Sequence, residues 1–419
     1  MVSSAAAAAG GAAGGGGAGE GEGQQVREEL AGDIAALEAE HHRHQQQEEA
    51  EAATEGNAGG DAVDEDAAAV AVRVAWAEEE AAAAEAVAGA GVGFFLEEVS
   101  YDYLVPPLSA YELARLGRAV ANSSHIRSVH LQLCFVGSPE NAVADFLLEI
   151  LAGGNNGRSR NHPSLRLVNL WNNGLNDKHA LSAAWGLGVN TSLDVLNLSC
   201  NSISDAGVAA VSRALLENAG SALRQLHLGE NIFGVEGCAA LRRALESPNC
   251  NLETLNLCGN RLGDAAIKEI AEGLAKNTSL TRLSLIGNSV TDEGCEAIAD
   301  VALCRNMTLR RLFLNDNRIT STGVLHLERV LGAGINCSVE EMPLFNNDAA
   351  TVDEAVRDKI NSLCESNRRC RRRFEAVMGH PASDVHPTSL WPLVLVGFNS
   401  KPTLLYRVVL ERAAPELFR

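Results

Sequence analysis

Residues 252–279 read LETLNLCGNRLGDAAIKEIAEGLAKNTS, and residues 280–308 repeat that phrase with the apolar letters kept and the others changed. Near its start, Leu255 and Leu257 alternate with other residues, which predicts a short strand with one buried face. Further along, Ile267, Ile270 and Leu274 recur at helical spacing, which predicts a helix with one buried stripe. We therefore expect each copy of the phrase to form a strand, a turn, a helix and a second turn.

The phrase recurs along much of the chain. Aligned on the pattern L-x-x-L-x-L-x-x-N, its copies begin at residues 126, 165, 193, 223, 252, 280, 309 and 339. The first spacing is 39 residues and the others lie between 28 and 30, a regularity that indicates structural repeats. No copy can bury its own apolar faces, so neighbouring copies must stack. Strands pack about 4.8 Å apart and helices about 8–10 Å apart, so the stack must curve. The expected fold class is α/β: a right-handed solenoid, or horseshoe, with a parallel concave sheet and outer helices.

Two polar positions recur with the same period. The ninth position is asparagine in every copy except the first, which has Cys134. A buried amide there can bond the backbone of its own turn and of the neighbouring copy, so we expect a structural ladder. Its members are Asn173, Asn201, Asn231, Asn260, Asn288, Asn317 and Asn347. Further along, Asp205, Asp264, Asp292 or Ser321 stands where we expect the helix N-cap.

Charge and composition divide the chain into four parts. Residues 1–98 carry 21 Asp or Glu against 3 Lys or Arg, which is −18 of the total net charge of −20. Such a segment is too polar to build a core, although Val26, Leu30, Ile34 and Leu37 lie at helical spacing within it. We expect a low-complexity acidic tail, largely disordered, at 1–93, an N-terminal cap at 94–125, about eight repeat units at 126–349 and a helical C-terminal capping segment at 350–419.

The same composition argues against several classes of function. Binding nucleic acid without sequence specificity needs an excess of Lys and Arg, which this chain lacks. The apolar run at 389–398 is too short to cross a bilayer, which takes about 20 residues. The 10 cysteines form no CxxC pair, as expected for reduced thiols inside a cell. We expect a monomeric cytoplasmic protein with no nucleic-acid or membrane partner, in which the sequons at Asn190, Asn277 and Asn306 have no role in glycosylation.

Positions 3, 5 and 7 of each predicted strand point away from the core and should line the concave face. These columns contain no paired carboxylates, no Ser/His/Asp set and no metal-ligand cluster. We therefore expect no enzyme activity, no catalytic residue, no cofactor and no metal. The columns do contain aromatic residues and arginines, which anchor protein interfaces. The candidate partner-binding residues are Trp171, Asn169, His227, Arg282, Arg311, Phe313 and Phe345.

The repeated units resemble the ribonuclease-inhibitor class of leucine-rich repeats, in which each unit has a full helix. The resemblance is carried by LDVLNLSCNSISDAGVAAVSRAL (193–215), LRQLHLGENIFGVEGCAALRRAL (223–245) and the two phrases between residues 252 and 303. It implies the solenoid fold but not one function, since the class includes inhibitors, Ran GTPase-activating proteins and innate-immune receptors. Such receptors carry a nucleotide-binding module, and this chain contains no G-x-x-x-x-G-K-[ST] motif.

The leading functional hypothesis is a non-enzymatic scaffold that binds a protein on the concave face. The alternative is a GTPase-activating regulator of a small GTPase, because residues 171–175 (WNNGL) resemble a turn of the Ran activators. From Asn176 onward the sequence departs from the glycine-rich continuation of that turn, and no acidic tail follows the last repeat. A ribonuclease-type inhibitor is a weaker alternative, because it predicts an acidic, Trp-rich concave face that these columns lack.

One basic cluster stands out in the sequence NRRCRRR (367–373). The run from Arg368 to Arg373 is typical of a nuclear-import signal or of a patch for an acidic partner. It also fits a solvated helix face beside buried Cys370 and Phe374. Nuclear localisation is therefore the alternative to the cytoplasm.

Overall fold

The structure is a computed structural model that describes residues 97–378 except 103, 105–106, 154–163 and 349–353. The predicted tail at 1–93, most of the insertion in the first unit and the chain after residue 378 lie outside the described residues. Strands and helices alternate in the order predicted from the repeated phrase. The elements are β1 (Glu98–Asp102), α3 (Ala110–Asn122), β2 (Ser128–Gln132), α4 (Glu140–Ala152), β3 (Leu167–Asn169), α5 (Asp177–Leu187), β4 (Val195–Asn197), α6 (Asp205–Glu217), β5 (Gln225–His227), α7 (Val235–Leu245), β6 (Thr254–Asn256), α8 (Gly263–Lys276), β7 (Arg282–Ser284), α9 (Asp292–Ala297), the π-helix η2 (Ile298–Leu303), β8 (Arg311–Phe313), α10 (Ser321–Gly332) and α11 (Glu354–Met378).

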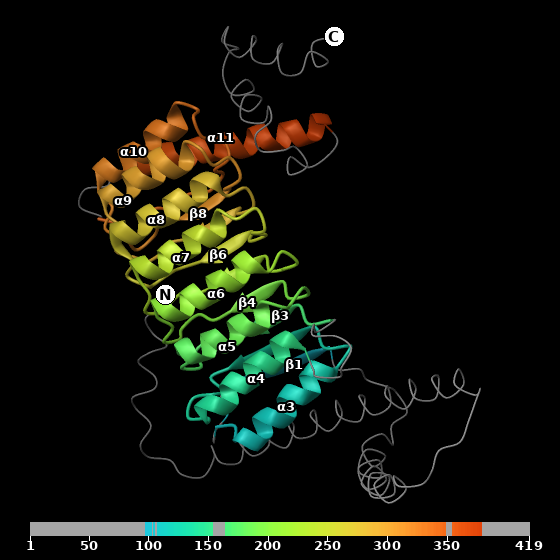
Figure 1. The fold of residues 1–419 in the computed structure, drawn as a ribbon. Helices are drawn as coiled ribbons and strands as arrows, with labels where there is room; N and C mark the ends of the chain where they lie inside the picture. The colour runs from blue at the N-terminus through green and yellow to red at the C-terminus, as the bar shows by residue number, and fades with distance from the viewer. Residues whose placement is uncertain (1–96, 103, 105–106, 154–163, 349–353, 379–419) are drawn as a thin grey trace, which may run out of the picture.

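The strands form one parallel eight-stranded sheet in the order of the chain, and the helices stack along its outer side (Figure 1). Each strand pairs with the next at the equivalent position, as Leu255 on β6 pairs with Leu283 on β7. The alternating leucines and the helix stripes face each other and form a single core. The predicted α/β leucine-rich-repeat solenoid is therefore confirmed. Among the described helices, none combines the length and apolar composition that a membrane crossing requires.

The first strand and helix extend the array toward the N-terminus. Strand β1 pairs in parallel with β2, and Val99, Tyr101, Leu113 and Leu116 lie buried beneath them. At the other end, the unit that starts at residue 339 contributes a single bridge, between Arg311 and Glu341. Helix α11 then packs against α10.

The asparagine ladder explains why position nine is nearly invariant within this chain. Asn288 is fully buried, and its Oδ1 accepts hydrogen bonds from the backbone N–H groups of Asn260 (3.0 Å) and Leu262 (3.4 Å) in the preceding unit. Its Nδ2 donates to the carbonyls of Leu257 (2.8 Å) and Ile286 (3.3 Å). Each asparagine thus satisfies backbone groups in a tight turn that strand pairing cannot reach. In the first unit, the Cys134 thiol replaces the amide as donor, 3.2 Å from the carbonyl of Tyr101.

A second ladder of asparagines, which sequence reasoning missed, lies at the turns between each helix and the next strand. Asn306 is nearly fully buried; its Nδ2 donates to the carbonyls of Leu274 (2.8 Å) and Asn277 (2.9 Å), and its Oδ1 accepts from the N–H of Leu309 (2.8 Å). The equivalent residues are Asn190, Asn218, Asn277 and Asn336. Four of these asparagines (all but Asn218) begin sequons, and their burial gives them a structural role instead.

The prediction that Asp205, Asp264 and Asp292 are the N-caps of their own helices is wrong. The N-cap residues of α6 and α9 are Ser204 and Thr291, each one position earlier, and α8 begins with Gly263 before Asp264. Ser321 likewise follows the N-cap Thr320 of α10. These aspartates point instead to the next unit, where they cap the helix of that unit.

Asp264 shows how this cap works between units. Its Oδ1 accepts hydrogen bonds from the N–H groups of Thr291 (2.8 Å) and Gly294 (3.0 Å), and its Oδ2 accepts from the Thr291 hydroxyl (2.6 Å). A carboxylate at this place satisfies free N–H groups at the start of α9 and complements the positive end of its dipole. A Cβ atom on Gly294 would lie only 2.5 Å from Oδ1, so glycine is needed where the carboxylate arrives.

The basic cluster has a structural role in part. Arg371 is 6% exposed and forms an ion pair with Glu340 of the last unit, and an Arg368 nitrogen donates to the Glu340 carbonyl at 2.9 Å. Asn367 donates to the carbonyl of Val339 at 2.9 Å. These contacts seal the end of the core, so two of the arginines in the run are committed to the fold. The interpretation of the whole run as a solvated helix face is therefore wrong for Arg371.

Acidification is expected to weaken the start of α5 through His179. The Asn176 N–H donates to Nδ1 of His179 (3.0 Å), so this nitrogen must be unprotonated, and Nε2 lies 3.2 Å from the Glu140 carbonyl. Burial lowers the pKa of His179 below 6.5, although the Glu140 carbonyl and carboxylate partly oppose that shift. The unfolded chain therefore binds more protons as the pH falls through 6.5, and stability decreases in that window.

Urea unfolding at pH 7.5 and pH 5.5 would measure this effect. We expect the wild type to lose stability at the lower pH and His179→Gln, whose amide can still accept and donate, to lose less. Some dependence of stability on pH should remain in this variant, because burial also lowers the pKa of His227. An unchanged difference between the two pH values in the His179→Gln variant would contradict this role.

Candidate functional site

The parallel register places the predicted concave columns side by side. Arg282 on β7 pairs with Thr254 on β6 and with Arg311 on β8. A second column lies two residues further along each strand. From β5 to β8 it consists of His227, Asn256, Ser284 and Phe313. The side chains of these columns are mostly half-buried, because each is flanked by its equivalents on the neighbouring strands.

Four of the candidate residues gather at the C-terminal end of the sheet. The Arg282 guanidinium carbon lies 4.9 Å from the centre of the Phe313 ring. Nε of Arg311 lies 3.4 Å from Oε2 of Glu341, and Phe345 in the last unit is 59% exposed. We call Arg282, Arg311, Phe313 and Phe345 the concave cluster. Such a stack presents an aromatic face and a cation together, which suits a partner with aromatic or acidic side chains.

The other candidates lie apart from this cluster. Asn169 on β3 accepts hydrogen bonds from the N–H of Trp171 (3.2 Å) and from Nδ2 of Asn197 (2.9 Å). Four strand spacings, or about 19 Å, separate β3 from β7, so one small ligand cannot contact both groups. His227 on β5 lies between them. Only a partner of protein size would span the whole set.

Burial shifts the pKa values of several titratable groups on and beside this face. Burial, and then the positive charge of Arg282, hold the pKa of His227 below its ordinary value. Burial and the Glu230 carboxylate raise the pKa of the Cys200 thiol to about 12, and burial also raises the pKa of Cys258. These thiols are therefore protonated at neutral pH, whereas a nucleophile or metal ligand needs the thiolate.

Sequence reasoning missed how Cys258 is accommodated. A Cβ atom on Gly229 of the neighbouring strand would lie 2.4 Å from the Cys258 Sγ, so the missing side chain leaves room for the thiol. The signal was present in the position-seven column, where Gly229 precedes Cys258. The ten cysteines all lie among the described residues, and none is in a disulfide.

The turn at residues 171–175, which resembles a turn of the Ran activators, contains Asn173 of the asparagine ladder. Oδ1 of Asn173 accepts from the N–H groups of Cys134 (2.8 Å) and Phe135 (2.9 Å), and its Nδ2 donates to the carbonyl of Leu131 (2.5 Å). Asn172 and Gly174 have positive φ angles of 54° and 67°, a conformation that residues of other units share at this turn. This turn therefore has the same structural role as its equivalents.

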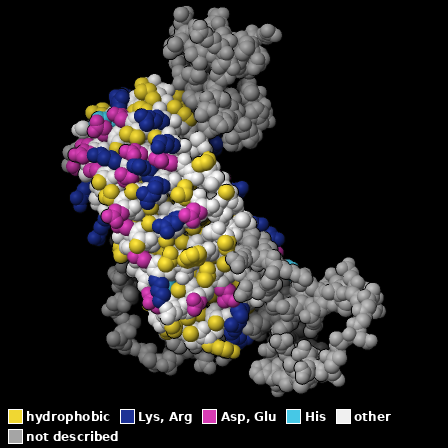
Figure 2. All heavy atoms as spheres, in the orientation of Figure 1, with side chains coloured by type: hydrophobic (Ala, Val, Ile, Leu, Met, Phe, Trp, Pro, Cys, Tyr) yellow, Lys and Arg dark blue, Asp and Glu magenta, His cyan; other side chains and the backbone are white. Residues whose placement is uncertain are grey.

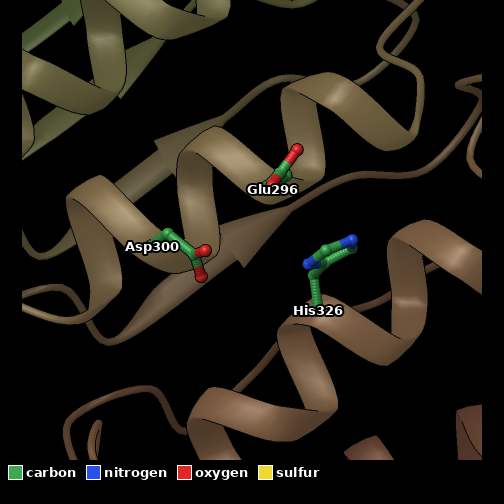
Figure 3. Close-up of side chains that lie close together, drawn as sticks. All are labelled: Glu296, Asp300 and His326. Atoms are coloured by element: carbon green, nitrogen blue, oxygen red, sulfur yellow. The ribbon is translucent and has the colours of Figure 1, made fainter.

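One group of described side chains has the residue types of a metal site, away from the sheet (Figure 3). Glu296 in α9, Asp300 in η2 and His326 in α10 have ligand atoms within 4.8 Å of one another. The two carboxylates are exposed, and Asp300 is already paired with Arg329. Exposed acidic groups often lie this close without an ion, and one of the two carboxylates is already in an ion pair, so we assign no metal here. The glutamate and aspartate also line a shallow groove of about 320 Å³ between α8 and η2.

Comparison with known proteins agrees with this architecture. The family described as Leucine Rich repeat matches residues 189–212, 249–271, 276–299 and 305–327. The ribonuclease inhibitor of Sus scrofa is 29% identical over 230 residues, which cover 48% of this chain and 49% of that protein. NACHT, LRR and PYD domains-containing protein 12 of Mus musculus is 30% identical over 239 residues, covering 56% of this chain and 21% of that protein. The chain thus contains leucine-rich repeats, and its units are similar to those of the ribonuclease inhibitor.

Two solved structures show a similar arrangement over part of their length. The complex of yeast Rad7 and Elc1 matches with a TM-score of 0.35 and 13% identity, covering 63% of this chain and 67% of that chain. The actin-binding site 2 of leiomodin-1 matches with a TM-score of 0.31 and 23% identity, covering 35% of this chain and 80% of that chain. The chain spans about half or less of the curated relatives named above.

Proposed function

We propose that this protein is a non-enzymatic scaffold that binds a protein partner on the concave face of the solenoid. The observation that supports this most directly is the concave cluster, where Arg282 stacks on Phe313 beside the exposed Phe345. This cluster contains the only cation stacked on an aromatic ring among the described strands. Aromatic residues and arginines of this kind provide most of the binding energy at protein interfaces.

The names of two relatives fit this proposal. One relative from Sus scrofa and one from Mus musculus are ribonuclease inhibitors, so they act on another protein. By analogy with them, we propose that this protein also binds another protein. The alternative of a GTPase-activating regulator gains no separate support from the turn at residues 171–175, and it stays a prediction that a single-turnover GTP hydrolysis assay with Ran would decide. A cytoplasmic location is part of the proposal, because ten cysteines without a disulfide suit a reducing compartment.

Affinity purification of the tagged full chain, read by quantitative mass spectrometry, tests the concave cluster. Phe313→Ala combined with Arg282→Ala removes the stack, and we expect a genuine partner to bind at least about 30-fold more weakly, as for a hot spot of 2 kcal/mol. Leu325→Ala on α10 is the matched control, because it removes an exposed apolar side chain from the outer face. Trp171→Ala tests the other end of the sheet. Retention of every partner by the double variant would rule out the concave cluster.

A further inference from the structure

The outer surface of the helices changes character along the solenoid (Figure 2). Over α7–α10 it is covered by ion pairs, such as Arg242 with Glu269 at 3.0 Å and Lys268 with Glu293 at 3.6 Å. Over α4 and α5 that surface has one such pair, Lys178 with Glu140 at 3.5 Å, and a group of exposed apolar side chains. Trp185 is 70% exposed, Leu181 is 50% exposed, and Leu148 and Val189 are also exposed. Apolar patches of this kind on a soluble protein mark places where another segment docks.

The repeat register shows how this patch is built. The first core residue of each helix from α3 to α7 is Leu113, Val143, Ala180, Val208 or Cys238. Five positions after each of them stands an exposed or half-exposed residue of the outer surface. In order these residues are Arg118, Leu148, Trp185, Arg213 and Arg243. Since neighbouring helices pack side by side, the five side chains form a row across the outer face, with Leu181 and Val189 one turn to either side of Trp185.

The arginines of this row differ from those of the ion-paired half. Arg118, Arg213 and Arg243 are exposed, and none of them takes part in an ion pair among the described residues. By contrast, Arg242 and Arg329 are paired with carboxylates of the adjacent helices. The outer patch, defined as Leu148, Leu181, Trp185 and Val189, is therefore an apolar centre between exposed arginines, although the charge of Arg118 also acts on the Glu149 carboxylate of α4. Its complement is an amphipathic segment with an apolar stripe and acidic flanks.

A segment with that chemistry exists in the same chain. Residues 24–40 read QQVREELAGDIAALEAE, with Val26, Leu30, Ile34 and Leu37 at helical spacing. The segment carries five Asp or Glu against one Arg. A further 56 residues, 41–96, connect it to β1, the edge strand beside α3. At up to about 3.3 Å per residue, that connection is long enough to reach α4 and α5.

We propose that residues 26–40 bind the outer patch of the same molecule. The apolar stripe would cover Trp185 and Leu181, and the acidic residues would face Arg118, Arg213 and Arg243. Covalent linkage raises the effective concentration of such a segment to the millimolar range, so even a weak contact would be occupied. This contact lies on the helix side of the solenoid and leaves the concave face free for the proposed protein partner.

Photo-crosslinking in the full chain tests this proposal. With p-benzoylphenylalanine in place of Trp185, we expect an intramolecular adduct to a peptide from residues 24–40, identified by mass spectrometry. The matched control carries the same group in place of Leu325, which is 53% exposed within the ion-paired half, and it should give no such adduct. An adduct only between two copies of the chain, an adduct only to another segment, or no adduct at all would overturn the proposal.

A second set of variants tests the apolar contacts and the charge contacts of this proposal separately. Leu30→Asp with Ile34→Asp is expected to lower the adduct yield at least about tenfold, because two apolar side chains lose their burial. These positions lie outside the repeat array, so the fold of that array is not at risk. Arg118→Glu with Arg213→Glu should lower the yield as well, and raised salt should weaken the wild-type adduct. A yield that is unchanged in Leu30→Asp with Ile34→Asp would overturn the proposal even if position 185 reacts with that peptide.

Discussion

Replacing Asn288 with alanine is expected to lower the free energy of unfolding by about 3–5 kcal/mol. The side chain is fully buried and makes four hydrogen bonds to the backbone of two units. Alanine would leave the N–H groups of Asn260 and Leu262 without partners, each at a cost of about 1–3 kcal/mol before relaxation. The carbonyls of Leu257 and Ile286 would each lose one of two donors, because Nδ2 of Asn260 and the N–H of Gly259 still reach them. The neighbouring turns would loosen to let water reach these groups.

Urea unfolding followed by circular dichroism measures this loss, with Asn256→Ala as the matched control. Asn256 lies four positions before Asn260 of the ladder, is half-buried on the concave face, and accepts a hydrogen bond from the backbone N–H of Cys258 at 3.1 Å. We expect that control to cost less than about 1 kcal/mol. Because repeat arrays can lose cooperativity, the slope of the transition should be compared as well. Equal losses for the two variants would show that the ladder contributes no special stability.

Replacing Gly294 with alanine is expected to destabilise the protein by about 2–4 kcal/mol, although alanine is the better helix former by about 1 kcal/mol. The new Cβ would lie 2.5 Å from Oδ1 of Asp264 and 2.6 Å from Cγ1 of Val290. The carboxylate would have to leave the start of α9, and the charge-assisted bonds to Thr291 and Gly294 would be lost. The steric and hydrogen-bond costs therefore outweigh the helix propensity.

Gly234→Ala is the control, because a Cβ atom there meets nothing within 4 Å. It should change the unfolding free energy by less than about 0.5 kcal/mol. A double variant, Asp264→Ala with Gly294→Ala, should cost less than the sum of the single variants, since the clash needs the carboxylate. Additive losses, or a neutral Gly294→Ala, would argue that the helix cap between units does not depend on this glycine.

The fold could be predicted because the same strand and helix pattern recurs in every repeat. Leucines at alternating positions and a helix stripe at fixed offsets recur with nearly one period, so errors at a single position do not matter. The ladder at position nine followed from the same repetition. The role of Asp264 was missed because its partners, Thr291 and Gly294, belong to the next unit, and spacing within one phrase favours a cap on its own helix.

For the candidate site, the sequence could predict only which strand positions face the concave side in each repeat. Sequence placed Arg282 and Phe313 on the concave face, but the stack between them depends on a diagonal contact across two strands. It also could not show that Trp171 and the concave cluster lie at separate parts of the sheet. The apolar surface around Trp185 needed the packed helices, because a tryptophan at helical spacing in the sequence is more often part of a core.

The position-nine asparagines and the capping aspartates point in opposite directions along the array. Asn288 serves the turn of the unit before it, whereas Asp264 caps the helix of the unit after it. Every interior repeat therefore supplies side-chain hydrogen-bond partners to the backbone of its neighbours and receives such partners from them. No repeat satisfies all of its own polar groups. The smallest piece that duplication, recombination or protein engineering can add or remove without orphaning polar groups is one complete period, cut at equivalent positions. That constraint gives a physical reason for the narrow range of repeat lengths, 28–30 residues, in all but the first unit.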